Sequence, residues 1–238
     1  MARWTTVAVA LSAVALVLVT PARPAAAVAR RTLSFSGYTW TVKSNAHRLG
    51  PGPNYFSKKN AWVDSLGRLH LVITKAKRHW TVGEVVNTRS LGYGTYTWVL
   101  DSRVDDLDPD MVLGLFTYDW TSPQFNYREI DIEASRWGDP FDPTNAQFVV
   151  QPYAHTGNLT RVTLGSSLPT TLSFHWTASG LSFSAPGASP SSWTYTGADR
   201  PPAGGEVPDI NFWLRGGHAP MNGHGAEVVV RSFTFTPG

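Results

Sequence analysis

The feature that most constrains the fold of this chain is a regular succession of short segments in which apolar and polar residues alternate. More than ten such segments follow residue 32, and turns rich in glycine and proline separate them. Alternation with a period of two indicates strands with one buried face, and no stretch shows the 3.6-residue period of an amphipathic helix. The pattern predicts an all-β fold, a two-sheet antiparallel sandwich of the jelly-roll type with one concave face that would form a substrate cleft.

The predicted strands share this alternation or a short, fully apolar run. They are Leu33–Lys43, Ala61–Asp64, Arg68–Thr74, Trp80–Thr88, Gly92–Val104, Met111–Thr117, Glu129–Ala134, Ala146–Tyr153, Thr160–Leu164, Thr171–Trp176, Leu181–Ser184, Ser192–Thr196, Ile210–Leu214 and Ala226–Phe235.

Residues 1–27 do not fit this strand pattern. Arg3 precedes the apolar run Val7–Val19, and a stretch of small residues and prolines ends at Ala27. This order predicts a secretory signal peptide, because the apolar run is shorter than the ~20 residues that a membrane-spanning helix needs. We therefore expect a secreted, extracellular protein with no membrane partner after cleavage, and a single domain over residues 28–238.

The charge balance gives no reason to expect a nucleic-acid partner. The chain has 20 Lys and Arg against 17 Asp and Glu, and removal of Arg3 and Arg23 with the signal peptide would leave 18 against 17. Binding of nucleic acid calls for a clustered basic surface. The chain has no cysteine, which excludes disulfides and a thiolate nucleophile, so a hydrophobic core must stabilise it. We expect a monomer.

One predicted strand carries three acids in alternation. In Glu129-Ile130-Asp131-Ile132-Glu133 the isoleucines would point to one face and the carboxylates to the other. Neighbouring carboxylates on such a face lie about 6–7 Å apart, and like charges at that distance raise one another's pKa. A protonated acid beside an ionised carboxylate is the arrangement that cleaves glycosidic bonds.

A charged, solvent-facing strand is the alternative interpretation, because it gives the same alternation. The surrounding residues favour a binding site, since aromatic rings suit the apolar faces of a sugar. Tyr118 and Trp120 lie upstream of the acids, and Tyr127 and Trp137 flank them.

The chain also resembles glycoside hydrolase family sixteen, whose members are secreted enzymes with a concanavalin A-like β-jelly roll. In addition to the acidic strand, the motifs that carry the resemblance occur in the same order from Asn54 to the C-terminus. They are Asn54-Tyr55, Trp62-Val63-Asp64, Gly67-Arg68-Leu69, Leu91–Tyr96, Phe174-His175-Trp176, Gly180–Phe183 and Ile210–Leu214. The chain departs from the family at Val112–Asp119, where members carry a tryptophan- and proline-rich stretch, and at the insertion Arg136–Asn145.

The resemblance implies roles for the three acids in an endo-acting, retaining glycosidase. Glu129 would be the nucleophile, Glu133 the general acid and base, and Asp131 the carboxylate that tunes them. The carboxyls of a retaining pair lie about 5–5.5 Å apart, whereas residues i and i+4 of a strand are about 13 Å apart at the backbone. The mechanism therefore requires the two glutamates to lean together over a curved strand.

Weaker candidates for contact with the polysaccharide are Trp120, Trp137, Tyr118, Gln151, Tyr153 and Asn54. Packing in the core is the alternative for each aromatic residue. We expect Arg128 to pair with an acid and His155 to lie at the rim. No histidine spacing indicates a catalytic metal, and we expect no cofactor. The resemblance allows a structural calcium ion, but the acidic loop Asp105–Asp110 lacks calcium-loop spacing, so a solvated turn is favoured there.

Three functions agree with these observations. The leading hypothesis is a secreted glycosidase that cleaves β-glycosidic bonds of a β-glucan or galactan. The second is a non-catalytic carbohydrate-binding module on the same fold, and the third is a structural cell-surface domain. Three like charges on one strand favour the enzyme, because a module that only binds sugar has no use for them.

Overall fold

The structure is a computed structural model that describes residues 30–238. The predicted signal peptide, residues 1–27, lies outside the described residues. Within them the fold is almost entirely β, with sixteen strands and two short 3-10 helices, η1 (Pro123–Arg128) and η2 (Arg215–Gly217). No described helix has the length and apolar character needed to cross a bilayer.

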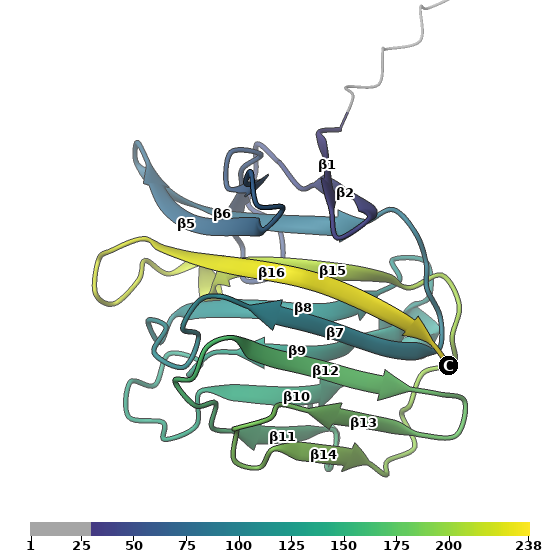
Figure 1. Cartoon of the computed structure of the whole chain (residues 1–238). Coiled ribbons are helices and arrows are strands. Elements are labelled where there is room, and N and C mark those ends of the chain that lie inside the picture. Colours follow the sequence, from purple (N-terminus) through teal and green to yellow (C-terminus); the bar gives the residue numbers. More distant parts are fainter. Residues whose placement is uncertain (1–29) are drawn as a thin grey trace, which may run out of the picture.

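The strands form two layers that pack face to face (Figure 1). In order across the sheet, the first layer consists of β4 (Ala61–Val63), β5 (Leu69–Ala76), β16 (Ala226–Pro237), β7 (Gly94–Leu100), β12 (Thr170–Trp176), β13 (Leu181–Ser184) and β14 (Ser192–Tyr195).

The second layer lies behind it in Figure 1. Its strands, again in order, are β11 (Leu159–Val162), β10 (Ala146–Val150), β9 (Ile130–Ala134), β8 (Met111–Tyr118), β15 (Val207–Leu214), β6 (His79–Asn87), β2 (Tyr38–Val42) and β1 (Thr32–Phe35). The short β3 (Tyr55–Phe56) pairs in parallel with β6, whereas the other strand pairs are antiparallel. Pairing of β5 with β6 connects the two layers. The antiparallel sandwich confirms the predicted fold class.

The core lies between the layers and explains which way the acidic strand faces. Phe148 of β10 stacks on Phe183 of β13 with ring centroids 5.0 Å apart, so Phe148 points from the second layer to the first. Ile132 lies directly opposite Phe148 in the β9–β10 pair and therefore points inward too. The side chains of Asp131 and Glu133, which alternate with the isoleucines, point to the outer side of the second layer. We call this outer side the carboxylate face.

Several predicted strand boundaries differ from the structure, and two of these differences have a clear local cause. The segment predicted as one strand over Leu33–Lys43 is a hairpin, because Ser36 and Gly37 adopt left-handed backbone angles with φ of 52° and 79°. The strand predicted to begin at Glu129 begins at Ile130, because η1 ends immediately before Glu129.

Candidate active site

The three acids of the central motif share one face, as the alternation predicts. Glu129 precedes β9, but its backbone is extended, with φ of −88° and ψ of 123°. Its carbonyl oxygen accepts a hydrogen bond of 3.2 Å from the N–H of Gln151, which prolongs the pairing of β9 with the end of β10. Glu129 and Glu133 are half-buried, and Asp131 is 3% exposed.

A tight loop precedes Glu129. Asn126, Tyr127 and Arg128 all have left-handed backbone angles, with φ between 49° and 57°, which residues other than glycine adopt at a cost in free energy. Arg128 donates from Nε to the carboxylate of Asp119 at 3.1 Å, and both side chains are largely buried. The N–H of Asp119 donates to the carbonyl of Tyr127 at 2.7 Å. This ion pair confirms the expected acidic partner of Arg128 and holds the loop in its strained shape.

Burial raises the pKa of all three acids. Burial first, and then the charge of Glu133, raises the pKa of Glu129 to about 8. Burial raises the pKa of Glu133 to about 7, whereas a hydrogen bond from Gln147 and the charge of Arg161 act in the opposite direction. The pKa of Asp131 is raised well above its usual range by burial and by the charges of Glu129 and Glu133. The cluster therefore retains protons at neutral pH.

Contact between two of these acids has opposite effects on their pKa values. A side-chain hydrogen bond joins Glu129 and Asp131, and it lowers the pKa of Glu129 while it raises that of Asp131. Two carboxyl groups can share a hydrogen bond only when one of them is protonated. The pKa of Glu129 is nevertheless about 8, so this contact offsets only part of the rise that burial causes.

Two glutamines of the neighbouring strand region hold the acids in place. Gln147 of β10 lies directly opposite Glu133 and donates from Nε2 to its carboxylate at 2.8 Å. Gln151, just after β10, donates to Asp131 at 3.1 Å. Behind Gln147, Arg161 of β11 donates to the Gln147 Oε1 atom at 3.2 Å. Neither Gln147 nor Arg161 was among the residues that we predicted for the site.

The row of residues that contains Glu133 continues across the next strands. In register with Glu133 lie Gly114 of β8, Asn211 of β15 and Glu84 of β6. A side chain at position 114 would collide with the Asn211 amide, so a glycine is needed there. Both carboxylate oxygens of Glu84 contact the Lys43 ammonium group, at 2.8 and 2.9 Å. These strands are far apart in sequence, so alternation within one strand could not have revealed the row.

A buried acid lies in the adjacent row. Asp209 of β15 is opposite Phe116, and Phe116 is opposite Asp131, so all three side chains share the carboxylate face. Asp209 is 1% exposed, and neither of its carboxylate oxygens has a hydrogen-bond partner among residues 30–238. Burial, followed by the charge of Glu84, raises the pKa of Asp209 well above its usual range.

Aromatic rings gather beside Glu129. Tyr118, at the end of β8, stacks on Tyr127 with ring centroids 5.1 Å apart and an interplanar angle of 9°. Trp120 lies 4.9 Å from Tyr118 and is 56% exposed. Burial and then the charge of Glu129 raise the pKa of Tyr118 to about 12. Thr117 pairs with Ile130, so the next residue, Tyr118, lies beside Glu129. Of the predicted aromatic residues, Tyr118 therefore lies at the carboxylates, with Trp120 against it.

Trp137 and Tyr153 have different neighbours from Tyr118 and Trp120. Trp137 packs edge-on against Trp213 of β15, with centroids 5.9 Å apart. Trp213 is two residues from Asn211 on β15, so its side chain shares the carboxylate face. Its indole nitrogen is buried and has no partner among the described residues. Tyr153 is 65% exposed, and its backbone N–H donates to the Gln151 Oε1 atom at 2.9 Å. His155 is exposed and pairs with Asp199 at 2.9 Å, in agreement with a place at the rim.

Asn54 is not brought to the carboxylates. Its amide nitrogen donates to the carbonyl oxygens of Pro51, Gly52 and Leu214 at 2.8–2.9 Å, and the residue is 3% exposed. The amide N–H groups are therefore committed to backbone carbonyls. Asn54 attaches its loop to the end of β15.

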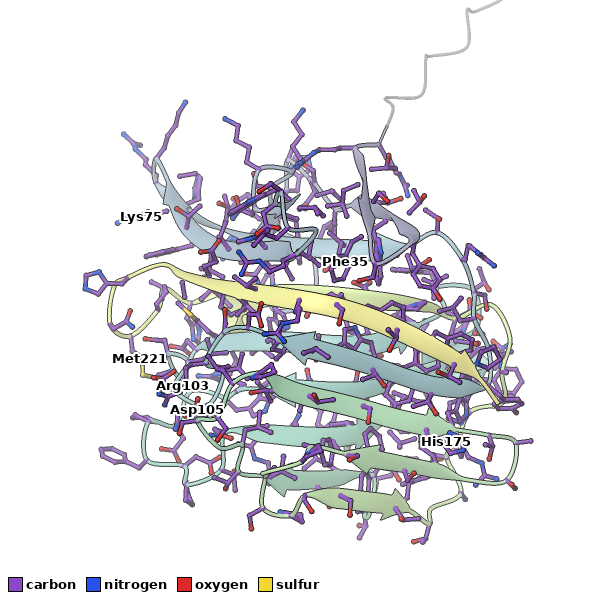
Figure 2. The ribbon with its side chains drawn as sticks, in the orientation of Figure 1. Phe35, Lys75, Arg103, Asp105, His175 and Met221 are labelled. Atoms are coloured by element: carbon purple, nitrogen blue, oxygen red, sulfur yellow. The ribbon has the colours of Figure 1, made fainter. Side chains whose placement is uncertain are left out.

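The acidic loop at residues 105–110 is bound by protein groups. Arg103 and Asp105 lie side by side at one end of the sandwich (Figure 2), with the Arg103 Nε atom 2.6 Å from an Asp105 oxygen. The carboxylate of Asp108 accepts the N–H of Met221 at 3.0 Å and that of Asn222 at 2.8 Å. No group of three potential metal ligands occurs between residues 30 and 238.

Solved structures share this fold. A β-glucanase of Bacillus licheniformis matches with a TM-score of 0.65 and 19% identity, covering 84% of this chain and 92% of that one. A pseudo β-1,3-glucanase and immunostimulatory antigen of Mycobacterium tuberculosis matches with a TM-score of 0.59 and 18% identity, covering 84% and 91%. The chain has the fold of these proteins.

A family-sixteen glycoside hydrolase from a mixed-linkage glucan locus of Bacteroides ovatus also matches. It was solved in complex with a G4G4G3G product, and the TM-score is 0.61, with 10% identity over 83% of this chain and 94% of that one. Comparison with protein-family models and with curated protein sequences gives no match. The structural likeness confirms, at the level of fold, the resemblance that the sequence motifs indicate.

Proposed function

We propose that this protein is a secreted glycosidase that cleaves β-glycosidic bonds of a polysaccharide, with Glu129 and Glu133 as its catalytic pair. The observation that carries the proposal is the cluster of Glu129, Asp131 and Glu133 on the carboxylate face. Burial raises the pKa of each, so that the cluster retains protons at neutral pH. A cluster of like charges costs folding free energy, and acid–base chemistry gives a reason to retain it.

We propose a double-displacement mechanism with retention of configuration, as the family resemblance implies. Glu129 in its ionised form attacks the anomeric carbon, and contact with Asp131 lowers the pKa of Glu129 against the rise that burial causes. Glu133, with a pKa of about 7, protonates the leaving oxygen. Glu133 then accepts a proton from water, which releases the sugar from Glu129. Gln147 limits the rise in the pKa of Glu133, so that Glu133 can both give and take a proton near neutral pH.

The structural neighbours support a β-glucan as substrate. One neighbour is described as a β-glucanase, and another is bound to a mixed-linkage glucan product. Trp120 offers an exposed ring close to the acids, on which the apolar face of a sugar could stack. We propose an endo-acting cut, because the outer surface of a sheet can hold a chain on both sides of the scissile bond.

The second candidate is a module that binds a glycan without cutting it. The M. tuberculosis neighbour, described as a pseudo β-1,3-glucanase, favours this alternative. The two functions differ in a single step, the formation of new reducing ends.

The test is to incubate the protein with mixed-linkage β-glucan, β-1,3-glucan and β-galactan and to measure new reducing ends. We expect release from at least one substrate, and a loss of about three orders of magnitude or more in Glu129→Gln and Glu133→Gln, because each removes an essential group. The control is Glu227→Gln, which changes a half-exposed glutamate of β16 in the other layer. Equal release by the wild type and both site variants would contradict the proposal, and binding without release would establish the module.

A further inference from the structure

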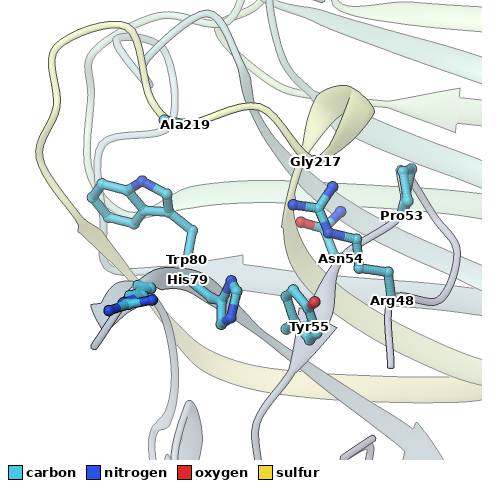
Figure 3. Close-up of a pocket in the computed structure, with 9 residues that line it drawn as sticks. Arg48, Pro53, Asn54, Tyr55, His79, Trp80, Gly217 and Ala219 are labelled. Atoms are coloured by element: carbon cyan, nitrogen blue, oxygen red, sulfur yellow. The ribbon is translucent and has the colours of Figure 1, made fainter. Parts of the chain in front are cut away.

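A hollow lies away from the carboxylates, where the start of β6 meets the loop before β3 and the turn after β15 (Figure 3). Its volume is about 220 Å³. This is below the roughly 300–1,000 Å³ of pockets for drug-sized ligands, so it suits one sugar unit or one charged group. Its lining is Arg48, Pro53, Asn54, Tyr55, Arg78, His79, Trp80, Gly217 and Ala219. We call it the basic pocket.

The basic pocket is lined by cations and contains no acid. Neither Arg48 nor Arg78 forms a salt bridge with any residue in the described part of the chain, and both side chains are exposed. Arg48 lies over the Tyr55 ring, 5.4 Å from its centroid, and His79 packs on the same ring at 4.7 Å. Two exposed guanidinium groups without an acidic partner make the hollow positively charged, which favours an anionic ligand.

The walls of the basic pocket are held in place by backbone interactions. Leu49 and Asn54 exchange backbone hydrogen bonds of 2.9 and 2.8 Å, and the Asn54 amide connects the loop to the Leu214 carbonyl. Gly217 has a φ of +65°, and a side chain there would come within 2.6 Å of the Pro53 carbonyl oxygen. The pocket is therefore formed before any ligand binds, which lowers the entropy cost of binding.

The basic pocket lies along the same strand as part of the carboxylate face. Trp80 and Glu84 are four residues apart on β6, so their side chains point to the same face of the sheet. Glu84 is in the row of Glu133. Three steps of about 4.8 Å between strands and four residues of about 3.3 Å place Trp80 roughly 20 Å from Glu133. A glycan chain cut at Glu133 can reach this pocket with a more distant unit.

We propose that the basic pocket binds an anionic substituent, a carboxylate or a sulfate, on a sugar unit of the polysaccharide. This inference rests on the proposed function, because it takes the ligand to be part of a glycan. Guanidinium groups bind both oxyanions through paired, charge-assisted hydrogen bonds. The half-buried Trp80 ring, which stacks on no other ring among residues 30–238, offers a face to the pyranose that carries the charge.

The test compares three polymers with one backbone: unmodified β-glucan, carboxymethyl β-glucan and sulfated β-glucan. Affinity is measured by calorimetry with full-length Glu129→Gln protein, so that cleavage does not consume the ligand. We expect at least one charged polymer to bind about tenfold or more tightly than the neutral one, with an advantage that falls as salt is added. The charged polymer that binds more tightly identifies the anion as a carboxylate or a sulfate.

The variants change charge at exposed side chains. In the double variant Arg48→Gln with Arg78→Gln the advantage of the charged polymer disappears, whereas Arg89→Gln, an exposed arginine at the other end of β6, keeps it. An advantage that survives the double variant, or equal binding of all three polymers, overturns the proposal. Preference for a charged polymer without release of reducing ends by the wild type would refute the proposed glycosidase alone. Release of reducing ends without a preference would refute the basic pocket alone.

Discussion

The Gln147 amide donates a hydrogen bond of 2.8 Å to the Glu133 carboxylate across the β9–β10 pair. A hydrogen bond to the ionised form lowers a pKa, so this contact counteracts the rise caused by burial. Replacement of Gln147 by methionine keeps the approximate length of the side chain and removes the donor. We expect the pKa of Glu133 to rise by roughly one unit, so the alkaline limb of kcat/KM against pH moves upward. The control is Gln124→Met, which changes an exposed glutamine of η1. An unchanged limb in Gln147→Met would contradict the role assigned to this contact.

The acids of the site should make the protein less stable as the pH rises. The pKa of Glu133 is about 7 in the folded state, against 4.5 as the ordinary value. Between these values the folded protein binds more protons than the unfolded chain, so the free energy of unfolding falls with increasing pH. We expect Glu133→Gln to be more stable than the wild type by on the order of 1–2 kcal/mol near pH 8.5, after allowance for solvent screening, and equally stable near pH 4. Thermal melts at both pH values measure the difference, and a pH-independent difference would count against the raised pKa.

Asp209 is expected to behave in the same way without any part in catalysis. Its ionised form is disfavoured by burial and by Glu84, and its oxygens lack partners among the described residues. Asp209→Asn should therefore raise the free energy of unfolding by about 1 kcal/mol at pH 8 and leave it unchanged at pH 4. The contrasting variant is Asp108→Asn, because the Asp108 carboxylate accepts three backbone N–H groups, and its loss should destabilise. Urea titration gives both values. Destabilisation by Asp209→Asn at pH 8 would show that the Asp209 carboxylate has a partner that the structure does not reveal.

The loop before Glu129 stores backbone strain. Asn126 has a φ of 49°, which glycine adopts freely and alanine does not. We expect Asn126→Gly to stabilise or leave unchanged the free energy of unfolding, and Asn126→Ala to lower it by about 1 kcal/mol. Equilibrium unfolding of the two variants measures the difference. Equal stability of the glycine and alanine variants would exclude strain at this position.

The central motif could be predicted because its information is local. The spacing of Glu129, Asp131 and Glu133 determines which side each faces, and the two isoleucines between them determine which side is buried. The alternation predicts one continuous strand at Ser36-Gly37, because a glycine within a strand also fits a regular alternation. The left-handed φ angles of these two residues make the segment a hairpin.

The partners of the acids could not be predicted, because they depend on register between distant strands. Gln147 meets Glu133 across the insertion Arg136–Asn145, whose conformation sets the β9–β10 register. Asn211 and Glu84 join the same row from strands about 80 and 50 residues away in sequence. Asn54 was predicted to contact sugar, but its amide N–H groups donate to carbonyl oxygens of its own loop and of Leu214.

The measurement that tests the account most directly is trapping of the glycosyl intermediate. Wild-type protein is incubated with an activated 2-fluoro β-glucosyl oligosaccharide, a reagent that slows the second step of a retaining enzyme, and is then analysed by intact mass and peptide mapping. The account predicts one glycosyl adduct per chain, located on Glu129 and absent from Glu129→Gln. An adduct on another residue, or turnover of β-glucan by an enzyme that forms no adduct and releases product of inverted configuration, would contradict it.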